Sequence, residues 1–304
     1  MTAWSLVSLL AVLVLAPALP GIAVKTKALL TGRRGAPTLQ LYWDLLRLLR
    51  KGTVYSRTTT WVFGLAPLAG VVTPVLAACL LPLDGRDAVL SFAGDFVGFA
   101  ALLALGRFTL VLAALDTGSS FEGMGASRDA SFASLVEPAL FLSFVVLALD
   151  SGSLSLSGML GGAAVTSWGV AVPSLAMVAV SLFFVLLAEA SRVPVDDPAT
   201  HLELTMIHEV AVLDHSGPGL ALLLYGGALR MAVFTALPVS VLVSRKGMAE
   251  PVALGVLAAG MLAVAVAVGV VESSMARLRL SRVPQFLVAA SVLASLGVIL
   301  KLLT

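Results

Sequence analysis

The chain has 304 residues, of which 59% are hydrophobic and 12% charged, and its mean hydropathy is +1.05. Soluble domains carry about 25% charged residues, so this composition excludes a soluble globular protein and indicates an integral membrane protein. The net charge of +2 identifies no partner, and the single cysteine, Cys79, excludes a disulfide framework, a cysteine-based zinc site and an iron–sulfur cluster. Any redox chemistry linked to this chain is therefore expected in another subunit.

Eight apolar runs are long enough to cross a bilayer, which takes a helix of about 20 residues. They predict an all-α bundle of eight transmembrane helices in one integral membrane domain over residues 1–304. Positive charge follows the first run instead of preceding it, the reverse of a signal peptide, so we expect a retained span. The runs lie near 2–24, 60–83, 88–115, 131–149, 159–190, 218–243, 251–272 and 285–303.

The distribution of lysine and arginine predicts the orientation. Thirteen of these residues follow odd-numbered spans, and four lie on the opposite side. Because positive charge favours the cytoplasm, we expect both termini outside, in the cytoplasmic (inner) membrane of a prokaryote. The cytoplasmic loops would then be 25–59, 116–130, 191–217 and 273–284.

The first of these loops contains an amphipathic segment. In LQLYWDLLRLLRK, Gln40, Asp44, Arg47 and Lys51 recur at helical spacing among apolar residues. A narrow polar stripe on an apolar helix of about 13 residues is typical of a helix lying in the membrane interface. Such a helix would either anchor the loop or form a platform that docks a peripheral subunit.

Five ionisable residues fall in or at the ends of the predicted spans, namely Asp95, Arg107, Glu137, Glu189 and Arg230. Charged groups at membrane depth normally face the bundle interior and pair with one another. Burial raises the pKa of a carboxyl group, so such acids can load and release protons near neutral pH. We expect a proton relay.

Each acid also has a structural alternative. Glu137 precedes Pro138 and could satisfy a kinked backbone, and Glu189 could be an interfacial cap. Asp95 could pair with Arg86 or line a water pocket. The sequence leaves these alternatives open.

A polar block over residues 189–217 carries six acids, one arginine and three histidines. Pro194 and Pro198 disfavour helix before them, which predicts an extended loop over 191–199. Thr200 and Glu203 then form a T-x-x-E capping box, which predicts a helix to about Leu213.

Metal binding by this block is not expected. His201 and His208 are two helical turns apart and H-E-x-x-H is absent, while the H-x-E fragment lacks the cysteines of a zinc deaminase. Protonatable residues packed against a partner subunit are the favoured interpretation, and a solvated loop is the alternative. The loop over 116–130, rich in glycine and serine, is expected to be flexible, with Arg128 and Asp129 beginning the next helix.

Together these segments resemble the membrane subunit shared by respiratory complex I and the group 4 membrane-bound hydrogenases. The complex I branch is the subunit 1 (NuoH) family, and the hydrogenase branch includes hydrogenase-4 component C and formate hydrogenlyase subunit 4. The resemblance covers essentially the whole chain, and its most specific stretches are GMGASRDASFASLVEP and AEASRVPVDDPATHLELTMIHEVAVLDHSG. The sequence segment THLELTMIHE and the Glu137-Pro138 pair resemble the hydrogenase branch. Complex I subunits typically have further glutamates where this chain has Ala199 and His201.

The resemblance implies an eight-helix fold that couples electron transfer in a peripheral arm to H⁺ or Na⁺ movement. It implies hydrogenase-like large and small subunits, an Fe-S protein and antiporter-like membrane subunits as partners, with the NiFe centre and Fe-S clusters in the partners and no nucleic acid. A complex I-type subunit contributing to a quinone site, a stand-alone secondary transporter and a purely structural anchor stay as alternatives.

The candidate residues fall into two groups. The resemblance implies that Glu137 and Glu189 line a polar channel with Glu203 and Asp196 at its cytoplasmic mouth. Together with Asp95 these acids form the candidate proton pathway. The resemblance also implies that Arg33, Arg34, Asp44 and Arg192 lie on the surfaces that meet the hydrophilic subunits. The candidate subunit interface consists of these four residues with Arg128, His201, His208, Glu209 and Asp214.

Overall fold

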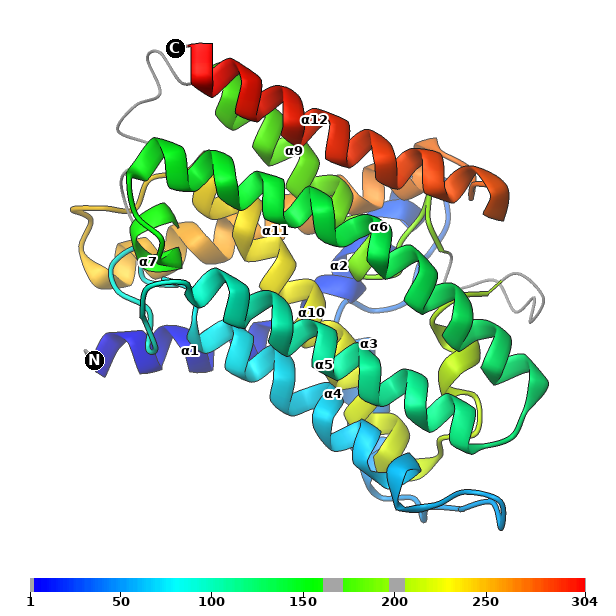
Figure 1. Cartoon of the computed structure of the whole chain (residues 1–304). Coiled ribbons are helices and arrows are strands. Elements are labelled where there is room, and N and C mark those ends of the chain that lie inside the picture. Colours follow the sequence, from blue (N-terminus) through cyan, green and yellow to red (C-terminus); the bar gives the residue numbers. More distant parts are fainter. Residues whose placement is uncertain (1–2, 161–171, 197–205, 304) are drawn as a thin grey trace.

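The computed structural model describes residues 3–160, 172–196 and 206–303, and this part of the chain is helical without a β-strand. Long helices run side by side between the two ends of a bundle, and both termini lie at the same end (Figure 1). The helices are α1 (Ala3–Leu15), α2 (Ala18–Leu30), α3 (Gln40–Leu49), α4 (Trp61–Cys79), α5 (Asp95–Asp116), α6 (Ser120–Ser151), α7 (Leu156–Gly158), α9 (Val172–Glu189), α10 (Gly217–Leu242), α11 (Glu250–Ser274) and α12 (Val283–Leu303), with 3-10 turns η2 (Glu209–Val212) and η3 (Leu280–Arg282).

Six described helices are long and apolar enough to cross a membrane, and the bent pair α1–α2 makes a seventh. The pair bends by 44° where Pro17 removes a backbone donor from the helix. The shorter α9, with 18 residues, occupies the place of the predicted fifth span. The sequence therefore predicted an all-helical membrane bundle correctly, and its count of eight spans is approximate.

The prediction of a flexible loop over 116–130 was wrong, because α6 begins at Ser120 and runs for 32 residues. At 1.5 Å per residue α6 is about 48 Å long, more than the roughly 30 Å hydrocarbon core. The glycines serve packing instead of flexibility. A Cβ on Gly125 would lie 3.0 Å from Val210 Cγ1, so glycine lets the η2 segment approach α6 closely.

Two expectations for the polar block also failed. Residues 191–196 form a tight turn in which Val195 and Asp196 donate backbone hydrogen bonds to the Arg192 carbonyl. No helix reaches Leu213, since residues 206–208 are non-helical and only η2 follows. The Asp196 carboxylate accepts the amides of Ile207 and His208, which competes with helix formation. Residues 197–199 of the expected loop and the capping-box pair Thr200 and Glu203 lie outside the described residues.

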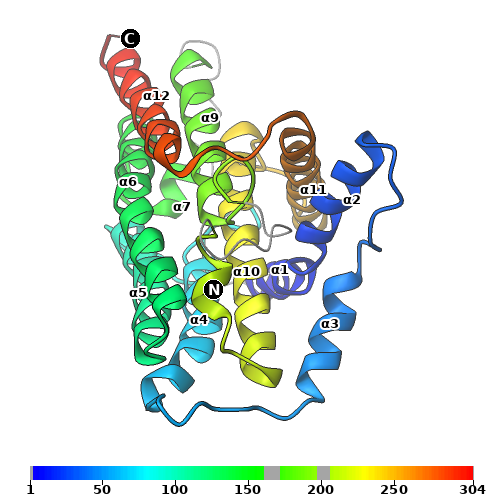
Figure 2. The ribbon, with the colours of Figure 1, turned by 90° about the vertical axis from the view of Figure 1, so that its right-hand side faces the viewer.

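The amphipathic helix is present as α3, slightly shorter than the segment the sequence indicated. Gln40 donates to Asp44 at 3.0 Å, and Asp44 lies 3.6 Å from Arg47, so the polar stripe is internally bonded. Figure 2 looks onto the end of the bundle where α3 lies beside α10, below α2. The Tyr42 hydroxyl donates to the Val14 carbonyl, which ties α3 to the end of α1.

Of the six described helices that could cross a membrane singly, α10 is the most buried, and it packs against α4, α9, α11 and α3. Glycine makes the closest crossings possible: a Cβ on Gly226 would lie 2.2 Å from the Gly70 carbonyl oxygen of α4. A Cβ on Gly106 of α5 would lie 2.2 Å from the Thr73 hydroxyl oxygen. These crossings pack α4 closely against α5, which carries Arg107, and against α10, which carries Arg230.

Candidate functional site

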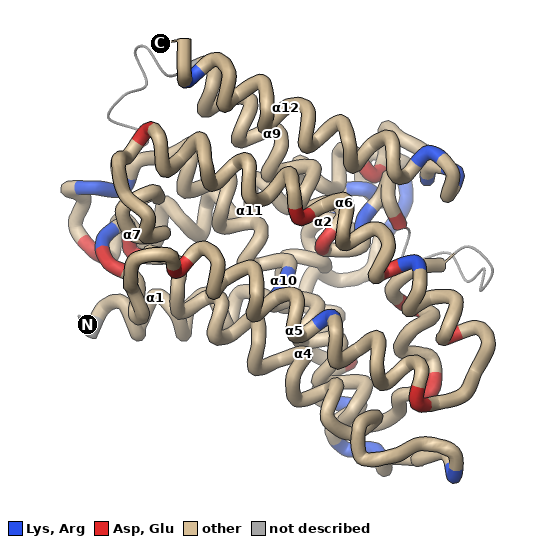
Figure 3. Tube along the Cα trace, in the orientation of Figure 1, with Lys and Arg blue, Asp and Glu red and all other residues tan. Residues whose placement is uncertain are grey.

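Charged residues lie mainly toward the two ends of the bundle (Figure 3). We call one of them the polar end; it carries α3, the turn over residues 190–196, η2 and the segment over residues 275–282. The end that carries both termini is called the opposite end. The charged residues of interest extend from the middle of α6, where Glu137 lies, toward the polar end.

The guanidinium of Arg107 joins three carboxylates. Its Nη2 donates to Glu189, its Nε lies 3.6 Å from Asp129 Oδ2, and its Nη1 lies 3.9 Å from Glu137 Oε1. The Arg107 side chain is only 10% exposed. These four residues form what we call the Arg107 cluster.

Helix geometry explains why they meet. Asp129 and Glu137 are eight residues apart on α6, so both face α5. Glu189 is the last residue of α9. Exposure rises across the cluster, from 5% for the Glu189 side chain to 14% for Asp129 and 46% for Glu137. The cluster therefore reaches from the bundle interior to its lateral surface.

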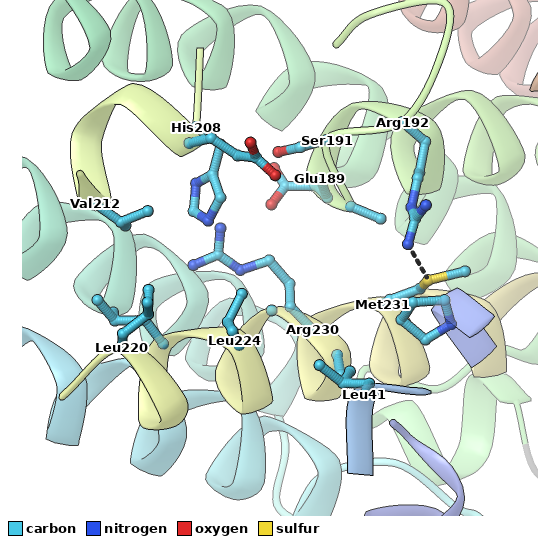
Figure 4. A pocket seen from close by; sticks show the side chains of 16 residues that line it. Leu41, Glu189, Ser191, Arg192, His208, Val212, Leu220, Leu224, Arg230 and Met231 are labelled. Carbon is cyan, nitrogen blue, oxygen red and sulfur yellow. Dashed lines mark hydrogen bonds between the residues drawn. The ribbon is translucent and has the colours of Figure 1, made fainter. Parts of the chain in front are cut away.

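Arg230 of α10 and His208 extend the cluster on the other side. Both are largely buried, and Arg230 points from α10 toward His208 and Glu189 (Figure 4). Burial lowers the pKa of His208, an effect that the negative charge of Asp129 partly opposes. The imidazole is therefore neutral near pH 7. Within the described part of the chain its Nδ1 is buried without a hydrogen-bond partner.

Two cavities adjoin these groups. A small one of about 20 Å³ is lined by Arg107, Asp129, Glu189 and Asp196, and it has room for one water molecule. A larger one of about 190 Å³ lies between α3, α10 and the turn after α9. Its walls are leucine, valine and alanine, and its polar lining comes from Glu189, Ser191, Arg192, His208, Glu209 and Arg230 (Figure 4).

Asp196 is one of the residues that line the small cavity. Besides accepting two backbone amides, it pairs with Arg277 at 2.9 Å. Arg192 pairs with Glu272 of α11 at 3.4 Å, and Glu272 also lies 3.9 Å from Lys27 of α2. These contacts fix the turn after α9 to α2 and α11. The Arg192 side chain is buried, with 7% exposure, and its ion-pair partner Glu272 belongs to the same chain.

Asp95 lies apart from this group. It is the first residue of α5, about 18 Å along the helix from Arg107, and it accepts the Leu156 amide at 2.6 Å. Its suggested partner Arg86 pairs with Glu250 instead, at 2.8 Å. The structure therefore brings Glu137, Glu189 and Asp196 together but leaves Asp95 near the opposite end.

The candidate interface residues lie around the polar end. Arg33 and Arg34 are exposed after α2. Arg128 donates to the Met206 carbonyl at 2.9 Å, which ties α6 to the segment before η2. The Asp214 amide donates to the buried carboxylate of Glu122 at 2.9 Å, while the Asp214 side chain is exposed. Asp44 is on α3 and Glu209 begins η2, whereas His201 and Glu203 lie outside the described residues.

Sequence reasoning missed the contributions of three acids: Asp129, Glu122 and Glu272. A signal existed for Asp129, because its spacing of eight residues from Glu137 places both on one helix face. Arg107 and Arg230 stood out as intramembrane charges, but the residues next to them in the sequence do not indicate which acids they pair with. Such pairings depend on how α5, α6, α9 and α10 pack.

A polytopic α-helical membrane protein with a buried cluster of ionisable residues is the class that fold and site define. The model of the NADH dehydrogenase family matches residues 3–303, and the chain belongs to that family. The family resemblance noted in the sequence is thus confirmed.

Relatives favour the hydrogenase branch of the family. Formate hydrogenlyase subunit 4 of Escherichia coli (strain K12) is 32% identical over 290 residues, covering 93% of this chain and 92% of that protein. Hydrogenase-4 component C of the same strain is 34% identical over 226 residues, covering 74% and 70%. A subunit of the NADH-quinone oxidoreductase of Paraburkholderia xenovorans (strain LB400) is 26% identical over 213 residues, covering 66% and 59%.

The fold has a counterpart among solved structures. A chain of the membrane-bound sulfane sulfur reductase, an archaeal respiratory membrane complex, superposes with a TM-score of 0.83 at 20% identity. The match covers 98% of both chains. At this identity the likeness establishes the fold.

Proposed function

We propose that this chain is the membrane-anchor and proton-channel subunit of a multi-subunit respiratory oxidoreductase of the group 4 [NiFe]-hydrogenase or formate hydrogenlyase type. Its polar end would face the cytoplasm of a prokaryote and dock the peripheral arm. That arm would consist of hydrogenase-like large and small subunits and an Fe-S protein, which would hold the NiFe centre and Fe-S clusters. The hydrogenase-branch relatives and the distribution of basic residues support this assignment.

The Arg107 cluster is the observation that carries the proposal. Three carboxylates share the Arg107 guanidinium, and Arg230 is the further described cation beside them. Three acids against two arginines leave one excess negative charge. One proton held among the acids would balance it, so the cluster is suited to take up and release a proton.

A charge change at the polar end would drive that proton. At an effective dielectric constant of about 20, a unit charge about 10 Å away changes an interaction energy by roughly 1.7 kcal/mol, more than tenfold in occupancy. Reduction of a metal centre in a docked partner supplies such a charge. The proton would pass from Asp196 through the small cavity to Glu189 and on to Glu137, and the signal would continue into antiporter-like subunits.

Substitution of Glu137 tests this proposal. Glu137→Gln keeps the shape of the side chain while removing its charge, so the complex should assemble and oxidise its electron donor. Ion transport into membrane vesicles, followed with a pH-sensitive or Na⁺-sensitive dye, should fall at least tenfold. Glu250→Gln at the opposite end is the matched control and should leave transport unchanged. Normal transport in the Glu137 variant would refute a channel role and leave a structural anchor.

The larger cavity favours a second candidate, a complex I-type subunit that contributes to a quinone site. It has apolar walls and a polar end, which fit an isoprenoid tail and a quinone head. Saturable binding of decylubiquinone that is abolished by Leu224→Trp, a substitution that fills the cavity, would support it. An absence of saturable binding would eliminate it.

Active ion transport by the chain purified alone would instead identify a secondary transporter.

A further inference from the structure

Glu137 exposes almost half of its side chain on the lateral surface of α6, at membrane depth. It lies 14 residues before Ser151, the last residue of α6 at the opposite end, which is about 21 Å along the helix. A hydrocarbon core of roughly 30 Å beginning near Ser151 therefore encloses the Glu137 carboxylate.

Lipid is an unfavourable neighbour for this group. Its one ion pair with a described residue, to Arg107 at 3.9 Å, is longer than a hydrogen bond, and the Arg107 guanidinium is shared with two other acids. A carboxylate offers about four acceptor positions, so the outward side of Glu137 needs a donor. Hydrocarbon supplies none, and a charged group that faces it is strongly destabilised.

The surface around Glu137 is built for close approach. Ser127, Ser131, Ser134 and Pro138 are exposed on the same part of α6. The Ser131 hydroxyl donates to the Ser127 carbonyl at 2.7 Å, and the Ser134 hydroxyl donates to the Ser131 carbonyl at 2.8 Å. The hydroxyl donors are therefore satisfied within α6, and the side chains are small enough for another helix backbone to come near.

The rest of α6 has a different surface. Nearer the opposite end, Val145 and Leu149 are 42% and 45% exposed, and such large apolar side chains suit lipid. The change from valine and leucine to serine coincides with the depth of Glu137. We call the part of α6 formed by Ser127, Ser131, Ser134, Glu137 and Pro138 the serine face.

We propose that a transmembrane helix of another subunit packs on the serine face and presents a basic side chain to Glu137. Charge complementarity supports this occupant, because the half-exposed Glu137 carboxylate is paired only at 3.9 Å, with a guanidinium that Asp129 and Glu189 also share. The inference deepens the proposed function by naming the surface and chemistry of the membrane partner. Its test measures contact between chains, so it can fail or succeed independently of ion transport.

Photo-crosslinking in native membranes tests the contact. The photoreactive amino acid benzoylphenylalanine is placed at Ser134 in the assembled complex, and at Val292 of α12, 51% exposed, as the matched control. Ser134 should give at least tenfold more adduct with a second polypeptide than Val292. Mass spectrometry should place that adduct in a transmembrane segment carrying lysine or arginine. Adducts with lipid alone, within this chain, with a second copy of it, or with a segment lacking a basic residue would overturn the proposal.

A bulky substitution gives a second measurement. Ser134→Phe should reduce co-purification of the crosslinked subunit at least tenfold, whereas Val292→Phe should not. Protection of the buried Cys79 thiol from maleimide verifies that each variant is folded. Wild-type co-purification with Ser134→Phe would overturn the interface. Crosslinking at Ser134 together with normal transport in Glu137→Gln would support the interface and refute the channel role. Absence of crosslinking together with impaired transport in Glu137→Gln would refute the interface and support the channel role.

Discussion

Arg107 of α5 donates a hydrogen bond to Glu189, the last residue of α9, and both side chains are at least 90% buried. Both helices pack against α6, which contributes Asp129 and Glu137 to the same guanidinium. One charged side chain thereby connects three helices. Substitution of any of its partners should therefore change both the free energy of unfolding and the rate of ion transport.

Removing the Glu189 charge should weaken both properties. In Glu189→Gln, a neutral amide replaces the carboxylate nearest to Arg107, and the remaining ion pairs with Asp129 and Glu137 are longer, so a buried charge is left less well compensated. We expect a loss of about 1–3 kcal/mol in the free energy of unfolding and an ion transport rate at least tenfold lower. Unfolding can be followed in detergent through maleimide labelling of Cys79, the single cysteine of the chain.

The control for that variant is Glu250→Gln. Glu250 pairs with a half-exposed arginine, Arg86, at the opposite end, and such pairs contribute about 0–1 kcal/mol. If the two variants lost equal stability, burial of the Arg107 cluster would add nothing to the strength of its ion pairs.

Arg107→Met should be much more harmful than loss of any one acid. It leaves three carboxylates near one another without their shared cation, which costs about 3–5 kcal/mol. Adding Glu189→Gln removes one uncompensated charge and should restore part of the stability, by about 0.5–3 kcal/mol relative to additivity. A double-mutant cycle of unfolding free energies measures this coupling. Simple additivity would mean that the two residues do not act as a pair.

His215 should make folding sensitive to acid. Its ring stacks on Phe63 with centroids 3.8 Å apart, and burial lowers its pKa from 6.5 to about 4. Between these values the unfolded chain binds a proton that the folded chain excludes, so stability falls as pH falls from about 6.5 to 4. Above pH 6.5 the full contribution is present.

His215→Phe keeps an aromatic ring on Phe63 but cannot titrate. Thermal unfolding midpoints measured between pH 7 and pH 4 should therefore decline less for this variant than for the wild-type chain. His208 is present in both proteins, so the difference between their pH profiles isolates His215. Parallel pH profiles would show that His215 does not exclude a proton in the folded state.

Adjacent glycines of α10 should respond in opposite ways to alanine. A Cβ at position 226 would lie 2.2 Å from the Gly70 carbonyl oxygen, so Gly226→Ala must separate α10 from α4, at a cost of about 1–3 kcal/mol or more. A Cβ at position 227 meets nothing within 4 Å, so Gly227→Ala should stabilise the helix by about 0.5–1 kcal/mol. The free energies of unfolding of both variants, measured in the same detergent, test this prediction. Equal effects would contradict the close crossing.

Local patterns were reliable where one residue's environment follows from its neighbours in sequence. Apolar runs and the polar stripe of Gln40, Asp44 and Arg47 located the spans and α3, because length and periodicity are properties of single segments. The same reasoning failed where distant contacts compete with local preference. The glycine-rich segment before Arg128 is helical because it packs on η2, and the segment over residues 206–208 is not, because the Asp196 carboxylate takes its amides.

The sequence by itself determined that this protein is a multi-pass membrane bundle of the NADH dehydrogenase family, and it identified Glu137, Glu189 and Asp196 as acids worth examining. Only the tertiary structure decided which charges meet: Arg107 with three carboxylates, Glu272 with Arg192 and Lys27, and Asp95 with none of them. The physical reason is that hydrophobicity acts on each segment separately, whereas an ion pair forms only between side chains that packing brings within a few ångströms.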